Sequence, residues 1–556
     1  MTKLSHLKES RLTRAASATI GRLRSTGVLA VAVLVLAAVF TSGAVAANHR
    51  GPALRMGSAR PDVISAVRTA LLNPTRYFKR PKLRHGVLSV IGTARGERIA
   101  LRLKSGRPTL LQVDVGDDGS AEFSFMRRKV ARIIVDARAG DDLVRIDETN
   151  GVFTDTIETA IDGGAGNDTL LGGSGAERLL GSDGNDSIDG NKGNDLALMG
   201  AGDDVFVWDP GDGSDVVEGQ DGADTMVFNG ANIADQVELS GNGSRLRFFR
   251  NPGMITMDTA GVEQVDFNAL GGADLVTVND LSGTDVQRLN VELEGTPGGA
   301  AGDGQLDRVV VNGTNRNDTI DVSGDASGVA VAGLRVRVAI RHQEPSDELV
   351  INGLAGDDVI SAAALAAQAI TLTVDGGEGA DTLAGGRGVE RLLGSNGDDS
   401  IDGNGGNDVA LMGAGDDVFV WDPGDGSDVV EGQDGADTMV FNGANIADQV
   451  ELSGNGSRLR FFRNPGMITM DTAGVEQVDF NALGGADTVI VNDLTGTGVM
   501  SVSAELGTGD GQSDRVVVNG TAGNDAIDVS GDAGEVKVSG LAATVAVFSS
   551  EFANDQ

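Results

Sequence analysis

The chain has 556 residues, a formal net charge of −37, 82 glycines, no cysteine and only 4% aromatic residues. The lack of cysteine excludes a disulfide framework, and so few aromatic residues argue against an ordinary globular core of this length. Lys and Arg outnumber acidic residues over residues 1–107, so the acidic excess lies in the rest of the chain. We expect no nucleic-acid partner for a chain of this kind.

Residues 1–46 have the features of a secretory signal peptide. A leader rich in Lys and Arg precedes an apolar run over residues 27–40, and Ala44-Val45-Ala46 offers a small-x-small cleavage site. The apolar run is shorter than the roughly 20 residues that a spanning helix needs. We therefore favour a cleaved signal over an uncleaved anchor, expect no stable transmembrane span, and predict a secreted protein that is extracellular or associated with the cell surface.

Residues 47–84 are basic and contain four prolines. A solvated linker is the favoured interpretation, and a tether to anionic cell wall or lipid head groups is the alternative. From Val87 onward, short stretches of alternating apolar and polar residues are separated by Gly and Asn, which favours strands over helices. Residues 85–160 are accordingly predicted to be an N-terminal β segment.

Seven nine-residue units run from Gly163 to Val227, with a two-residue insert at Trp208-Asp209, and they define a block over residues 161–230. Every unit has glycine at its fourth position, an acidic residue at its sixth and an apolar residue at its eighth. Glycine permits the left-handed backbone of a tight turn, and a carboxylate is a hard ligand for a hard cation. The apolar residue is the one side chain per unit that must face inward.

The block recurs over residues 375–443, and residues 197–274 reappear without change as residues 410–487. The segments 231–374 and 444–556 also contain matching stretches, with 309–325 similar to 516–532. Each segment is predicted to be β-rich, either as a wider continuation of the repeats or as a separate small sandwich. The chain stops at Gln556 where the earlier copy proceeds into another AGDD turn, which we interpret as an uncapped or truncated array.

The nonads resemble the hemolysin-type, repeats-in-toxin (RTX) family, whose consensus is G-G-x-G-x-D-x-apolar-x. The resemblance implies an all-β fold: right-handed parallel β-roll or β-helix solenoid blocks, arranged here in tandem super-repeats. It also implies two nonads per coil, with Ca²⁺ ions held between stacked turns by flanking carboxylates and turn carbonyls, several ions per block. The implied metal ligands are Asp168, Asp186, Asp195, Asp204, Asp215, Asp224, Asp381, Asp399, Asp408, Asp417, Asp428 and Asp437.

Two departures from the family pattern occur in both blocks. Glu177 and its copy Glu390 stand at the sixth position with a side chain one methylene longer than Asp, which weakens the prediction of a site there. The insert at Trp208-Asp209 is expected to break the stack between Asp204 and Asp224.

The favoured function is that of a secreted calcium-binding protein with a structural or adhesive role. Its partners would be calcium ions and a cell wall or extracellular polymer. The alternative is a calcium-dependent secreted enzyme or toxin, but the four histidines form no H-E-x-x-H, and no G-x-S-x-G or cysteine is present. We expect no catalytic residue. A disordered calcium buffer is disfavoured, since it would have no need of a regular inward apolar residue.

Overall fold

The computed structural model describes residues 78–507, 511–532, 534–551 and 554–556. The expected signal peptide and residues 47–77 of the expected linker lie outside these ranges. Residues 79–556 form one compact unit. Its described residues contain no α-helix, and the one 3-10 helix is η2 (Arg127–Lys129). No helix in the described part is long and apolar enough to cross a membrane.

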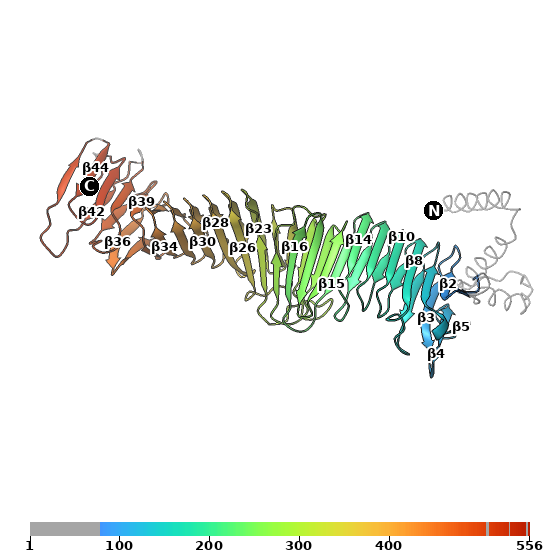
Figure 1. The fold of residues 1–556 in the computed structure, drawn as a ribbon. Helices are drawn as coiled ribbons and strands as arrows, with labels where there is room; N and C mark the ends of the chain where they lie inside the picture. The colour runs from blue at the N-terminus through green and yellow to red at the C-terminus, as the bar shows by residue number, and fades with distance from the viewer. Residues whose placement is uncertain (1–77, 508–510, 533, 552–553) are drawn as a thin grey trace, which may run out of the picture. The chain divides into compact units, whose positions relative to one another are not determined.

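The strands belong to two sheets, and the chain passes back and forth between them (Figure 1). The first sheet contains β1 (Lys82–Arg84), β2 (Val87–Ile91), β6 (Arg132–Asp136), β8 (Glu158–Ala165), β10 (Arg178–Asp183), β12 (Leu196–Ala201), β14 (Val216–Asp221), β16 (Gln236–Asn242), β17 (Arg245–Asn251), β18 (Ile255–Ala260), β20 (Leu275–Val278), β22 (Arg308–Asn312), β26 (Glu348–Ala355), β28 (Thr371–Glu378), β30 (Arg391–Asn396), β32 (Val409–Ala414), β34 (Val429–Asp434), β36 (Gln449–Asn455), β37 (Arg458–Asn464), β38 (Ile468–Ala473), β40 (Thr488–Val491) and β42 (Arg515–Val518).

The second sheet contains β3 (Arg98–Lys104), β4 (Arg107–Val115), β5 (Phe123–Met126), β7 (Leu143–Asp147), β9 (Thr169–Leu171), β11 (Ser187–Asp189), β13 (Val205–Trp208), β15 (Thr225–Asn229), β19 (Gln264–Asn268), β21 (Arg288–Glu292), β23 (Thr319–Asp325), β24 (Gly328–Ala332), β25 (Arg337–Arg341), β27 (Val359–Leu365), β29 (Thr382–Ala384), β31 (Ser400–Asp402), β33 (Val418–Trp421), β35 (Thr438–Asn442), β39 (Gln477–Asn481), β41 (Ser501–Glu505), β43 (Asp528–Gly531), β44 (Glu535–Ser539) and β45 (Thr544–Phe548).

Each nonad supplies one short strand and one turn, and two nonads complete a coil. In the first block β8, β10, β12 and β14 pair in parallel in one sheet, while β9, β11, β13 and β15 pair in parallel in the other. Leu179 lies beside Ile161, and Ile188 beside Leu170, so equivalent residues of successive coils stack on each other. These observations confirm the predicted all-β class and the parallel β-roll.

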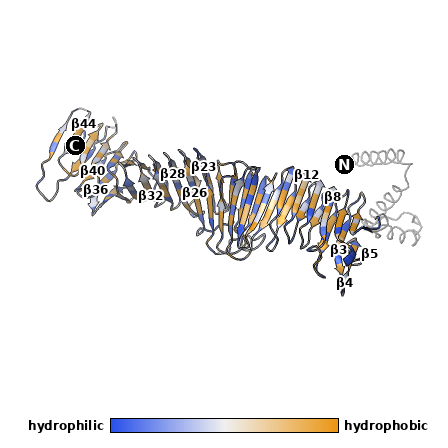
Figure 2. Ribbon diagram, in the orientation of Figure 1, coloured by the Kyte–Doolittle hydropathy of each residue, from blue (hydrophilic) through white to orange (hydrophobic). Residues whose placement is uncertain are grey.

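The core is a narrow column of apolar side chains between the sheets. Along the short strands, buried and half-buried residues alternate, and the eighth residue of each nonad is fully buried, as Leu170, Ile188 and Phe206 show. Hydrophobic and hydrophilic residues are accordingly interleaved along the ribbon of both sheets (Figure 2). One inward apolar residue per nonad is enough to fill the core because the inner faces of the two sheets pack against each other.

The Trp208 insert does not break the stack, contrary to the prediction. β12 pairs with β14 and β13 with β15 across it, so the coil is longer but keeps its register. The Trp208 ring is fully buried and stacks on Phe228, with ring centroids 4.0 Å apart. Its indole N–H donates to the Gly213 carbonyl at 2.8 Å. The extra residues therefore form a local loop that is closed by the tryptophan.

The segments between the repeat blocks continue the same two sheets. In 231–374, β16 and β17 form an antiparallel hairpin inserted into the first sheet between β18 and β20. Further along, β23, β24 and β25 form an antiparallel meander in the second sheet, between β21 and β27. The hairpin recurs in 444–556 as β36 and β37. Strand pairing through 231–374 thus passes from block to block without a separate sandwich.

Antiparallel strands also occur at the beginning of this unit. β1, in a region that we expected to be linker, pairs antiparallel with β2. In the second sheet, β3, β4 and β5 form an antiparallel meander, and β3 pairs in parallel with β7.

Candidate calcium sites

The turns of successive coils approach each other more closely than any residue with a side chain would allow. Gly184, at the fourth position of its nonad, has a φ of +131°, and a Cβ there would lie 2.0 Å from the Gly166 carbonyl oxygen of the preceding coil. Gly202 has a φ of +138°, and its Cβ would lie 2.1 Å from the Gly184 oxygen. At these two positions glycine is therefore required by both backbone conformation and space.

Stacking brings the acidic residues of the sixth position into rows, which we call carboxylate ladders. In each ladder the backbone N–H of one residue donates to the Oδ1 atom of the equivalent residue in the next coil. Asp168 donates to Asp186, and Asp186 donates to Asp204, each at 2.7 Å. The bond from Asp204 to Asp224, which spans the Trp208 insert, measures 2.9 Å.

The ladders lie along the two edges at which the chain changes sheet. Along the edge from the first sheet to the second lie Asp168, Asp186, Asp204 and Asp224, and in the second block Asp381, Asp399, Asp417 and Asp437. Along the opposite edge lie Asp195 and Asp215, and in the second block Asp408 and Asp428. All twelve residues named from the sequence are buried, at most 2% exposed.

The second carboxylate oxygen of these residues has no hydrogen-bond partner. The Oδ2 atoms of all twelve are buried without one. At Gly181 a Cβ would lie 2.4 Å from Oδ2 of Asp186 and 2.2 Å from the Met199 carbonyl oxygen of the next coil. Because Gly181 has no side chain, oxygens from two coils face the same point, and Ca²⁺ prefers oxygen ligands at 2.3–2.6 Å. The donor set fits calcium.

Burial raises the pKa of these carboxyl groups, because water no longer solvates the charged form. Burial, and after it the neighbouring carboxylates Asp204 and Asp168, raise the pKa of Asp186 to about 7. On the opposite edge, burial raises the pKa of Asp195 to about 9, with a smaller contribution from Glu177. Its copy Asp408 has a pKa raised to about 8, again chiefly by burial. A bound divalent cation would offset this cost.

Carboxylates alone do not complete a site. Among the described residues, no group of three or more His, Cys, Asp or Glu side chains is placed to hold a metal ion. A calcium ion at a ladder would therefore be held by two Asp carboxylates from successive coils and by turn carbonyl oxygens. There the ion would neutralise buried charge and join two coils.

Glu177 and Glu390 begin ladders rather than continue them. The Oε2 atom of Glu177 accepts the backbone N–H of Gly173 in its own turn at 2.9 Å. In the copy, both carboxylate oxygens of Glu390 accept N–H groups of its own turn. The longer side chain folds back onto its own turn, which engages both oxygens of Glu390 and one oxygen of Glu177, whose Oε1 atom is buried without a hydrogen-bond partner.

Sequence reasoning missed two residues that extend the ladders beyond the nonads. The N–H of Asp142 donates to Asp168 at 2.7 Å, and that of Asp358 donates to Asp381 at 2.8 Å. Both have an unpartnered Oδ2 atom and are at most 3% exposed. The signal was present in the shared AGDD turn of residues 139–142 and 355–358.

A further ladder crosses the segment between the blocks and contains a cation from the protein itself. Its backbone N–H bonds link Asp235, Asp274, Asp307 and Asp347. At its head, the Arg250 guanidinium from the inserted hairpin lies 2.7 Å from Asp235 Oδ1, and both side chains are buried. Arg463 and Asp448 repeat this pair.

Fold and ladders together define the protein as a parallel β-roll solenoid with stacked oxygen-rich turns. The model of the RTX calcium-binding nonapeptide repeat (4 copies) matches residues 160–176, 171–206, 211–232, 373–389, 385–419 and 424–445. The chain therefore carries RTX calcium-binding repeats in two blocks, as predicted from the nonads.

The comparison with curated proteins gave no match. Among solved structures, the extracellular lipase LipA from Serratia marcescens is similar at 17% sequence identity and a TM-score of 0.14. The similarity covers 62% of this chain and 43% of the lipase chain, so it spans less than half of the lipase.

Proposed function

We propose that this protein is exported and that extracellular calcium completes its two β-rolls, which then serve as a structural or adhesive scaffold. The observation that carries the proposal is the unpartnered, buried Oδ2 atom on each of the twelve ladder residues. A buried carboxylate without a counterion opposes folding. Calcium between two coils would remove that cost, so ion binding and folding would be one equilibrium.

Export is supported by the sequence of residues 1–46 and by the chemistry of calcium. Extracellular modules bind calcium with dissociation constants of about 10⁻⁴–10⁻³ M. Sites of that affinity would stay empty inside a cell and fill outside it. The scaffold would therefore assemble after export.

A calcium titration followed by far-UV circular dichroism tests the proposal. The chain, prepared without its predicted leader, is expected to gain β structure cooperatively with calcium and not with magnesium. A variant with Asp186→Asn and Asp399→Asn, one change in each block, should need more calcium for the same transition. Full β structure in EDTA with no calcium uptake would contradict the proposal.

We propose no catalytic role, because the sequence lacks a recognisable nucleophile or zinc-ligand motif. The alternative of a calcium-dependent enzyme or toxin predicts turnover or lysis. Incubating the calcium-loaded protein with ester, peptide and glycoside substrates, and with erythrocytes, separates the two. Activity that co-purifies with the protein would favour the alternative.

A further inference from the structure

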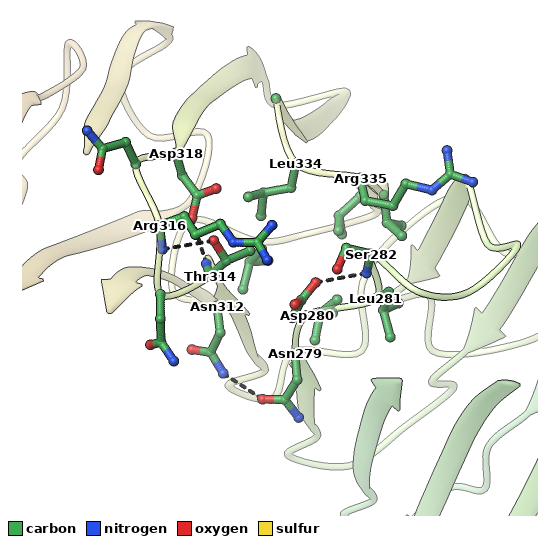
Figure 3. A pocket seen from close by; sticks show the side chains of 17 residues that line it. Asn279, Asp280, Leu281, Ser282, Asn312, Thr314, Arg316, Asp318, Leu334 and Arg335 are labelled. Carbon is green, nitrogen blue, oxygen red and sulfur yellow. Dashed lines mark hydrogen bonds between the residues drawn. The ribbon is translucent and has the colours of Figure 1, made fainter. Parts of the chain in front are cut away.

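A pocket lies outside both repeat blocks, in the segment that joins them. It encloses about 490 Å³, within the usual range of small-molecule pockets. Three pieces of chain form its walls: residues 278–282 after β20, residues 311–318 around the end of β22, and residues 333–338 before and within β25 (Figure 3). Two connections from the first sheet to the second thus meet one turn within the second sheet here.

Fixed hydrogen-bonding groups line one side of this pocket. The Asn312 side-chain amide donates to Oδ1 of Asn279 at 2.9 Å, which sets the orientation of both amides. The carboxylate of Asp280 accepts the Ser282 N–H at 2.8 Å, and that of Asp318 accepts the Thr314 N–H at 2.6 Å. Each carboxylate therefore keeps lone pairs for a ligand that brings hydroxyl donors.

Aliphatic side chains line another part of the pocket. Leu281 and Val336 are buried and belong to the lining, and Leu334 is half-buried beside them. An aliphatic surface next to amide and carboxylate groups suits a ring with a C–H face and polar edges.

Two arginines add positive groups to a pocket whose lining also contains the carboxylates of Asp280 and Asp318. Figure 3 shows Arg316 extending across the pocket beside Thr314, and Arg335 at the rim with its side chain directed away from Arg316. Both are exposed, and neither forms an ion pair among the described residues. In a chain of net charge −37, arginines without an acidic partner are free to bind a ligand anion. A guanidinium group binds a carboxylate with two parallel hydrogen bonds.

The second super-repeat provides an internal comparison. Its equivalent depression has the same amide pair, with Asn519 donating to Asn492 at 2.9 Å, and the same Asp493 and Leu494. Gly523 and Ala542 stand where the first copy has Arg316 and Arg335. This depression encloses only about 10 Å³. The copy therefore keeps the amide pair, the aspartate and the leucine but lacks both arginines and most of the enclosed volume.

We infer that the pocket binds an acidic saccharide. Arg316 and Arg335 would bind the carboxylate, Asp280, Asp318 and the Asn pair the hydroxyl groups, and Leu281 the C–H face of the ring. The inference deepens the proposed adhesive role, and it rests on that role for an exported setting in which acidic polymers occur.

Titration calorimetry of the calcium-saturated protein tests this inference with digalacturonate as the probe. Lactose, a neutral disaccharide, and acetate, a carboxylate without a sugar, are the comparison ligands. Digalacturonate is expected to bind most tightly. Replacing both arginines, Arg316→Ala and Arg335→Ala, should weaken it at least about tenfold, because charge-assisted hydrogen bonds are lost. Calcium stoichiometry should stay the same, since neither arginine belongs to a ladder.

The binding stoichiometry and the calcium measurement make the test decisive. Digalacturonate should occupy one site per chain, because the depression in the copy encloses only about 10 Å³ and lacks both arginines. Absent or arginine-independent binding in protein with its full calcium content would overturn the saccharide site alone. Equal affinity for acetate and digalacturonate would reduce the site to a simple anion site and would also overturn it. Failure of calcium loading would instead count against the proposed function.

Discussion

The substitution Asp186→Asn isolates the role of charge in a ladder. Asparagine keeps the Oδ1 acceptor for the Asp168 N–H, which lies 2.7 Å from it, and removes the negative charge. Because Asp186 lies between Asp168 and Asp204, it would be shared by two calcium sites. At a calcium concentration 100-fold above the dissociation constant, each site stabilises the fold by about 2.7 kcal/mol. The variant should therefore lose up to about 5 kcal/mol of calcium-dependent stability.

The sign of the effect should reverse when calcium is removed. Burial raises the pKa of Asp186 to about 7, so its ionised form opposes folding at pH 8 in calcium-free protein. Without calcium, Asp186→Asn should therefore be at least as stable as the parent. Urea unfolding in EDTA and in saturating calcium gives both values, and equilibrium dialysis counts the ions.

Asp221→Asn provides the matched control, since Asp221 is exposed and lies outside the ladders. It should lose no ion. An unchanged number of bound ions in Asp186→Asn, or equal destabilisation with and without calcium, would refute the shared-site reasoning.

Three further predictions follow from the same geometry. Gly184→Ala should prevent the coils from stacking and should lower the free energy of unfolding more than Gly211→Ala does. Gly211 has a similar φ of +115°, but a Cβ there would have no atom within 4 Å. Equal losses of unfolding free energy in urea would contradict this prediction. Arg250→Ala should cost about 3–5 kcal/mol by leaving Asp235 buried without its cation; a smaller loss in the same assay would mean that water or calcium replaces the guanidinium. The raised pKa of Asp195, about 9 against an ordinary 3.8, means that its carboxyl favours folding at low pH and loses that effect as pH rises toward 9. Calcium-free protein should therefore gain β structure when pH falls from 8 to 5, and a flat circular dichroism signal would argue against it.

The regular part of the fold could be predicted because the sequence of each nonad is sufficient to define its strand and its turn. Glycine, carboxylate and apolar residue recur at fixed positions, so strand, turn and stacking direction follow from one unit. The Trp208 insert was misjudged because its effect depends on a tertiary contact. Only stacking on Phe228 and the bond to Gly213 show that Trp208 is packed in the core while the strand register continues.

The segments between the blocks were less predictable for a physical reason. Alternating apolar and polar residues define strands but not their partners. β16 and β18 have similar patterns, yet β16 pairs in parallel with β20 and β18 with β14. The partner of each strand depends on contacts between residues far apart in the sequence, which the pattern of one strand does not contain. The pairing of Arg250 with Asp235 is a long-range contact of the same kind.

The exact duplication has a consequence for how such a protein can grow. β14 lies between β12 and β18 in the first copy, and β34 lies between β32 and β38 in the second, with the same register. Because each coil contacts only its neighbours, a further copy of the unit would pack at both ends against coils with the same surfaces as those already present. Recombination between the identical stretches can therefore lengthen or shorten the protein by whole units. The length of the solenoid can therefore change by inheritance without the evolution of any new interface between coils.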